Sequence, residues 1–211
     1  IWFRGLRLDV GPGVFIPRLE TELVTECAVD EARRLVMAGS APSVIDLCAG
    51  TGAIALAIAN EVPGARVSAV ELDEAALVWT HRNLADTGVE VLAGDALEAP
   101  DDGRRFDVVV TNPPYLRRVD APVMPTDVTD HEPDLALFSG DDGLDLPRRL
   151  IDRAAQLLVP GGLFVMEHDD TQREALTGCM AMAAQWDEIE DHDDLAGRPR
   201  FVTARRRCKD V

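Results

Sequence analysis

Residues 43–60 read SVIDLCAGTGAIALAIAN, which predicts a buried strand, a glycine turn and a helix in succession. Short apolar runs of this kind alternate with helical patterns along most of the chain, as is typical of a parallel α/β sheet. The apolar runs predict strands at 43–47, 66–72, 89–93, 106–111, 163–166 and 201–205. The helical patterns predict helices at 19–38, 52–60, 74–86, 146–158 and 171–185.

Two further segments have a distinct character. Residues 6–10 and 14–16 flank Gly11-Pro12-Gly13, which predicts a hairpin ahead of the first long helix. Residues 116–133 contain Pro122 and Pro125 and are long and irregular for a compact domain. We therefore expect a functional loop there rather than a simple connection.

Bulk composition limits the class of protein. With 211 residues, 46% of them hydrophobic and 28% charged, the chain suits one globular domain, and no apolar run approaches a membrane span. The four cysteines are scattered without metal-ligand spacing, so we expect reduced thiols, a cytoplasmic protein and no metal. The net charge of −17 argues against an enzyme that grips a nucleic-acid backbone.

The ends of three successive predicted strands carry a candidate nucleoside site. Glycines after the first strand allow a sharp turn and a close backbone approach near a helix N-terminus. Glu71 ends the second strand, where a carboxylate can accept both ribose hydroxyls, and Asp95 could accept from an adenine amino group. S-adenosylmethionine has a ribose and an adenine but no phosphate. The expected cofactor contacts are Asp46, Cys48, Ala49, Gly50, Thr51, Gly52, Glu71, Leu72, Asp95, Ala96 and Asn112.

The fourth predicted strand ends in Asn112-Pro113-Pro114-Tyr115. The Asn112 side chain and the Pro113 carbonyl can each accept a hydrogen bond from a planar N–H₂ group, and the prolines fix the backbone between them. Tyr115 offers a flat face to the same group. These four residues are the candidate catalytic and substrate-binding segment.

Together with the glycine turn, Glu71 and Asp95, this segment resembles the class I S-adenosylmethionine-dependent methyltransferases. Three further blocks narrow the resemblance to the protein-(glutamine-N5) methyltransferases that modify peptide-chain release factors. They are FIPRLETE at 15–22, DHEPDLAL at 130–137 with GDDGLD at 140–145, and LAGR at 195–198. The resemblance implies methylation of the glutamine side-chain amide in a Gly-Gly-Gln tripeptide.

The resemblance also implies an architecture and partners. We expect a mostly parallel, Rossmann-like sheet of seven strands with helices on both faces, a hairpin and entry segment at 1–18, and a catalytic domain at 19–211. A small N-terminal helical docking domain common in the family would be absent from this chain. The implied partner of this monomer is a release factor, with no nucleic acid or membrane. We expect Phe15 and Arg18 on the substrate side, Arg18 closing the rim with a loop acid.

Some residues depart from the family pattern or leave alternatives open. Leu19 stands where the family commonly has Pro, and the segment after Glu167 differs from the frequent Glu-Ile-Gly. His131, Glu132 and His168 are candidate acids or bases, although loop structure is the commoner role of such residues. Two rival functions stay open: a nucleic-acid adenine or cytosine N-methyltransferase, which uses a similar strand end with base flipping, and a non-enzymatic nucleoside-binding regulator.

Overall fold

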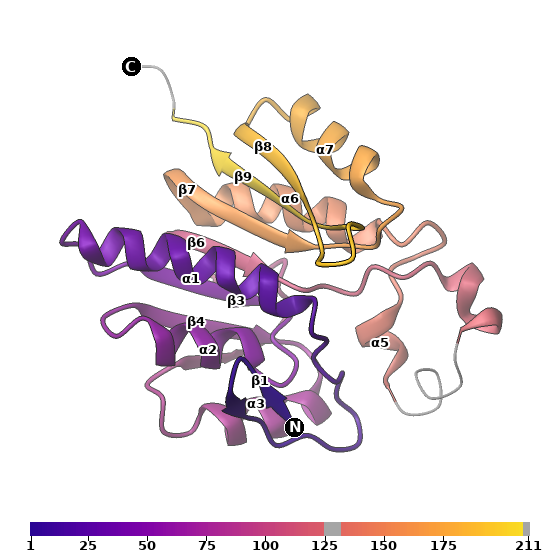
Figure 1. Cartoon of the computed structure of the whole chain (residues 1–211), viewed down its shortest axis with the longest axis horizontal. Helices are drawn as coiled ribbons and strands as arrows, with labels where there is room; N and C mark the ends of the chain where they lie inside the picture. The colour runs from indigo at the N-terminus through magenta and orange to yellow at the C-terminus, as the bar shows by residue number, and fades with distance from the viewer. Residues whose placement is uncertain (125–131, 209–211) are drawn as a thin grey trace.

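The computed structural model describes residues 1–124 and 132–208, and its centre is a sheet of seven strands (Figure 1). Their order across the sheet is β5-β4-β3-β6-β7-β9-β8. The strands are β3 (Ser43–Leu47), β4 (Arg66–Glu71), β5 (Glu90–Ala93), β6 (Phe106–Thr111), β7 (Leu158–Glu167), β8 (Trp186–Asp193) and β9 (Pro199–Arg206). All neighbours are parallel except those of β9, which runs antiparallel to both β7 and β8. The expected seven-stranded Rossmann-like fold is confirmed.

The parallel register aligns the carboxyl ends of the central strands. Leu47 of β3 lies opposite Thr111 of β6, and Glu71 of β4 lies opposite Ala93 of β5. The segments that follow these strands therefore meet along one edge of the sheet. This edge carries every predicted cofactor-binding segment.

Helices cover both faces of the sheet. They are α1 (Thr21–Met37), α2 (Ala53–Glu61), α3 (Glu74–Leu84), α5 (Asp134–Leu137), α6 (Asp145–Leu157) and α7 (Arg173–Met182), with a 3₁₀ turn η1 (Arg118–Val123). Alternate residues of each strand serve opposite faces. Val44 and Val108 pack with α1 and α2, whereas Ile45 and Val109 pack with α6 and α7. Figure 1 shows α1 lying along the middle strands of the sheet.

An N-terminal hairpin is present, but its predicted strands were wrong. It pairs β1 (Trp2–Phe3) with β2 (Leu6–Arg7), not 6–10 with 14–16. Asp9 instead bonds the Asn83 side chain through both its N–H, at 2.8 Å, and its carbonyl, at 2.9 Å. Gly11 sits so close to Trp79 that a Cβ there would lie 2.2 Å from the indole ring. The glycine-rich segment therefore packs along α3 and does not turn a hairpin.

The edge strand β8 was not predicted from its residues. Its sequence, WDEIEDHD, lacks a hydrophobic alternation because it pairs only with β9 and most of its side chains reach solvent. The helix predicted at 171–185 accordingly ends earlier, at Met182. Strand β7 begins at Leu158, five residues before the predicted start at 163, and so includes Gly161 and Gly162. Among the described residues, no helix is both long and apolar enough to cross a membrane.

Candidate active site

A cleft opens at the carboxyl edge of the sheet, and most of the predicted site residues line it. The predicted residues on its wall are Phe15, Cys48, Ala49, Gly50, Thr51, Glu71, Leu72, Asp95, Ala96, Asn112, Pro113, Pro114 and Tyr115. The sequence did not single out other lining residues, among them Val14, Pro17, Thr21, Asp73, Ala76 and Leu135. Asp46, Gly52 and Arg18 are the predicted residues that do not reach the cleft wall.

Gly50 and Gly52, the two glycines of the turn after β3, have different structural roles. Gly50 has a φ of +54°, and a Cβ built there would meet no atom within 4 Å. Gly52 has a φ of +79°, and its Cβ would approach the Leu84 side chain to 3.0 Å. Gly50 thus keeps the cleft open, whereas Gly52 lets α2 begin close against α3.

The Glu71 side chain accepts hydrogen bonds from two backbone N–H groups and so fixes the backbone at these positions. Its Oε2 accepts from the Gly50 N–H at 2.6 Å and its Oε1 from the Asp73 N–H at 2.8 Å. Burial raises the pKa of the Glu71 carboxyl, and these backbone hydrogen bonds act to lower it. Each carboxylate oxygen retains a further lone pair. The side chain therefore joins the ends of β3 and β4 and can still accept from a ligand hydroxyl.

Asp46 lies beneath the turn instead of in the cleft. It is fully buried, and its Oδ2 accepts from the Ala55 N–H at 3.2 Å at the start of α2. Burial raises the pKa of the Asp46 carboxyl to about 8. Within the described ranges, neither Asp46 Oδ1 nor Thr51 Oγ1 has a hydrogen-bond partner. One unpaired buried polar atom, Asp46 Oδ1, therefore lies beneath the glycine turn, and another, Thr51 Oγ1, belongs to the turn itself.

Asp95 lines the cleft and also organises the turn after β5. Its Oδ1 accepts from the Leu97 N–H at 2.9 Å. With Glu71 and Asp73 it makes three carboxylates on the wall, and no described lining residue is Lys, Arg or His. Such a wall suits a cationic, phosphate-free ligand.

The Asn112–Tyr115 segment is held by three side-chain hydrogen bonds with other parts of the chain. Asn112 Nδ2 donates to Thr21 Oγ1 at 3.1 Å, and the Tyr115 hydroxyl donates to Glu167 Oε1 at 3.0 Å. Gln172 Nε2 donates to the Tyr115 carbonyl at 2.9 Å. A Cβ on Gly143 would lie 2.2 Å from that carbonyl, so this position requires glycine. No donor in the described part of the chain reaches the Asn112 Oδ1 or the Pro113 carbonyl oxygen.

The ion pair between Arg18 and a loop acid, which the sequence led us to expect, is present next to the cleft-lining residues Pro17 and Pro133. Arg18 donates to both oxygens of Glu132, at 2.8 and 2.7 Å, with its guanidinium 4.8 Å from the centre of the Phe15 ring. Glu132 is buried, and it also accepts from the Ile16 N–H at 3.4 Å. This pair ties the entry segment to the loop after β6. His131 lies outside the described residues.

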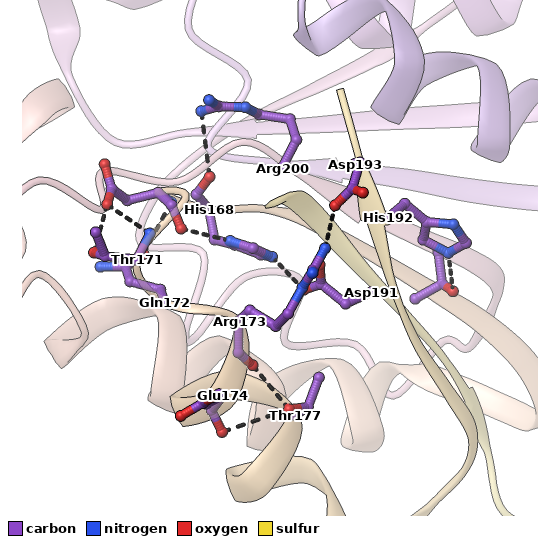
Figure 2. Close-up of polar contacts among 12 residues, drawn as sticks. His168, Thr171, Gln172, Arg173, Glu174, Thr177, Asp191, His192, Asp193 and Arg200 are labelled. Atoms are coloured by element: carbon purple, nitrogen blue, oxygen red, sulfur yellow. Dashed lines mark hydrogen bonds and ion pairs between the residues drawn. The ribbon is translucent and has the colours of Figure 1, made fainter. Parts of the chain in front are cut away.

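His168 has a structural environment and does not line the cleft. It is fully buried, its Nε2 lies 2.8 Å from Asp191 Oδ2, and its Nδ1 lies 2.8 Å from the Asp169 carbonyl. Figure 2 shows His168 and Arg173 converging on Asp191. The His168 side chain therefore fastens the end of β7 to the edge strand β8. The described residues contain no cluster of His, Cys, Asp or Glu able to hold a metal.

Comparison with known proteins fits this geometry. A family model, the methyltransferase small domain, matches residues 7–125. The chain is 50% identical to a release factor glutamine methyltransferase of Streptomyces coelicolor over 97% of its own length and 73% of the relative's. It is 44% identical to one of Bifidobacterium longum, over 96% and 72%. The chain belongs to the release factor glutamine methyltransferase family. It is accordingly an enzyme of methyl transfer.

The chain is also similar to methyltransferases that are named for other substrates. A Streptomyces pristinaespiralis protein named 4-amino-L-phenylalanine/4-methylamino-L-phenylalanine methyltransferase is 41% identical over 88% of the chain and 64% of that protein. A Thermus thermophilus 16S rRNA N2 G1207 methyltransferase solved with AdoMet and guanosine matches with a TM-score of 0.65. It is 24% identical, over 93% of this chain and 46% of its own. At that identity the solved structure supports the fold of this chain and no finer conclusion.

Proposed function

We propose that this enzyme transfers a methyl group from S-adenosylmethionine to the glutamine side-chain amide in the Gly-Gly-Gln tripeptide of peptide-chain release factors. The observation that carries the proposal is the pair of open acceptors, Asn112 Oδ1 and the Pro113 carbonyl, at the end of β6 beside an acidic cleft. The names of the family's curated members supply the substrate class.

The residues around the glycine turn fit S-adenosylmethionine. Thr51 Oγ1, in the turn and on the cleft wall, lacks a described partner, Gly50 leaves room above the turn, and Glu71 has acceptor capacity for ribose hydroxyls. The carboxylates on the wall favour a ligand that carries a sulfonium and an ammonium group over one that carries phosphates. When bound, S-adenosylmethionine supplies an electrophilic methyl group.

Positioning is the main task left to the chain, because an amide nitrogen is a poor nucleophile. Asn112 Oδ1 and the Pro113 carbonyl would each accept a hydrogen bond from one N–H of the substrate amide. These two bonds would turn the amide nitrogen toward the methyl group. Tyr115 would flank the amide plane. Good positioning of two reactants can supply about 7–11 kcal/mol of barrier lowering. No strong base is needed if the amide proton leaves to solvent after the transfer.

Two other substrates present the same planar N–H₂ group. A nucleobase would, but the net charge of −17 and the absence of basic side chains among the described lining residues oppose it. An aromatic amine would too, and the relative from Streptomyces pristinaespiralis carries such a substrate in its name. The aromatic amine is the second candidate.

A direct comparison separates these three substrates. The protein is incubated with S-adenosylmethionine labelled in its methyl group and, separately, with a release factor, with single- and double-stranded DNA and rRNA, and with 4-aminophenylalanine. We expect label in the release factor alone. Label in nucleic acid or in the amine, with none in the release factor, would overturn the proposal.

A further inference from the structure

Resting on this proposed function, we propose that Thr21 and Glu167 are positioning residues which set the direction of the Asn112 carboxamide, so that its oxygen faces the substrate. A carboxamide has a donor end and an acceptor end, and rotation by half a turn exchanges them. Only the acceptor end can receive an N–H from a substrate amide. Whatever fixes that direction decides whether Asn112 can act at all.

Thr21 fixes one end of the carboxamide. Its hydroxyl oxygen accepts from Asn112 Nδ2 at 3.1 Å, across a separation of 91 residues in the chain. The Thr21 side chain is buried at the first turn of α1, so solvent does not compete for this bond. The Asn112 oxygen is thereby left as the polar atom that can serve a ligand. A hydroxyl can also donate, however, and a donated proton would attract the opposite end of the carboxamide.

Glu167 removes that ambiguity. It is buried at the end of β7, its Oε1 accepts from the Tyr115 hydroxyl at 3.0 Å, and its Oε2 has no described partner of good geometry. The Thr21 hydroxyl acts to lower the pKa of this carboxyl, which is the direction that a nearby donor gives. A Thr21 proton aimed at the unpaired Glu167 Oε2 would leave Thr21 Oγ1 able to serve Asn112 solely as an acceptor. One carboxylate would then order both Asn112, through Thr21, and Tyr115 directly.

This arrangement depends on the charge of Glu167. Burial raises the pKa of its carboxyl to about 7, while the hydrogen bonds from Thr21 and Tyr115 and the charge of Arg200 act to lower it and the charge of Glu20 acts to raise it. Once protonated, Glu167 could donate to Thr21 and release the Thr21 proton toward Asn112. The carboxamide would then lose its fixed direction. Turnover should therefore fall as the pH drops below about 7.

Matched substitutions on α1 test the inference. Thr21→Val keeps the shape and removes the hydroxyl, Thr21→Ser keeps the hydroxyl, and Thr25→Val removes a buried hydroxyl one turn later that bonds only the Thr21 carbonyl. We expect Thr21→Val to lower kcat by about tenfold to a hundredfold without changing the cofactor Kd, because a misplaced amide costs about that much. Thr21→Ser should retain most of the activity, and Thr25→Val should lower stability but not kcat.

Two further measurements keep the test decisive. Glu167→Gln should lower kcat and abolish the fall of activity below pH 7. If Thr21→Val does not fold, the Glu167→Gln variant carries the test.

The ¹⁵N side-chain amide signals of Asn112 should shift in Thr21→Val but not in Thr25→Val, whether or not a substrate is known. If wild type does not methylate release factors, the proposed function fails while these signals still test the orientation. Wild-type kcat and unshifted signals in Thr21→Val, or equal losses in Thr21→Ser and Thr21→Val, would overturn the inference.

Discussion

Replacing Glu71 with Ala should weaken cofactor binding while leaving the sheet intact. In the native chain this carboxylate accepts from the Gly50 and Asp73 N–H groups and keeps one lone pair on each oxygen for ribose hydroxyls. A hydrogen bond to a charged group contributes about 1.5–3 kcal/mol. Loss of one such bond to the ligand corresponds to roughly a 10- to 150-fold increase in Kd.

The same substitution also leaves two backbone N–H groups without their acceptor. We therefore expect a lower unfolding midpoint in urea as well as weaker binding. Part of this loss is offset, because burial raises the pKa of Glu71 and its charged form is costly to bury. The two effects separate when binding is measured at a temperature at which the variant is fully folded.

Calorimetric titration with S-adenosylhomocysteine measures the binding term. Glu74→Ala is the matched control, because Glu74 is exposed at the start of α3 and does not line the cleft. The control should bind as wild type does. A folded Glu71→Ala protein with unchanged affinity would refute the reasoning and remove this carboxylate from the cofactor site.

Three further substitutions test other parts of the site. Asn112→Ala should reduce single-turnover methylation of the release factor by at least about a hundredfold with cofactor affinity within about tenfold, and equal rates would contradict the positioning role. The folded-state pKa of Asp46 is raised to about 8; its contribution to stability is therefore largest at low pH and is lost as the pH rises from its unfolded value toward 8. Asp46→Asn cannot ionise, so its Tm relative to wild type should increase over that range, and a constant difference would contradict the burial effect. Arg18→Met leaves buried Glu132 without its ion-pair partner and should cost on the order of 1–3 kcal/mol in urea unfolding, whereas Arg117→Met, which breaks an exposed pair, should leave the urea midpoint close to that of wild type.

The central strands and the glycine turn could be predicted because their signals are local. Residues 43–47 and 106–111 are apolar runs that the sheet buries on both faces, and their predicted bounds agree with β3 and β6. Strand β8 gave no such signal, since an edge strand with one neighbour tolerates charged side chains. The hairpin was placed on the wrong residues because Gly11-Pro12-Gly13 suggests a turn, and packing against Trp79 cannot be inferred from spacing.

The wall of the cleft was largely predictable, and its supports were not. Residues after successive parallel strands must meet at one edge, which identified Glu71, Asp95 and Asn112. The contacts of Thr21 with Asn112 and of Glu167 with Tyr115 join positions 91 and 52 residues apart. A buried Thr or Glu has no characteristic neighbours in sequence. Such partners emerge only when the fold brings α1 and β7 against the end of β6.

The most direct test of the account is the position of the methyl group on the release factor. After incubation with the protein and S-adenosylmethionine, a release-factor domain that carries Gly-Gly-Gln is digested and analysed by fragmentation mass spectrometry. We predict one added methyl group on the glutamine side-chain amide. A matched domain with Gln→Asn should gain none, because its amide stops one methylene short of the two acceptors. Methyl on another residue, methyl on the Asn version, or methyl on nucleic acid with none on the glutamine would contradict the account.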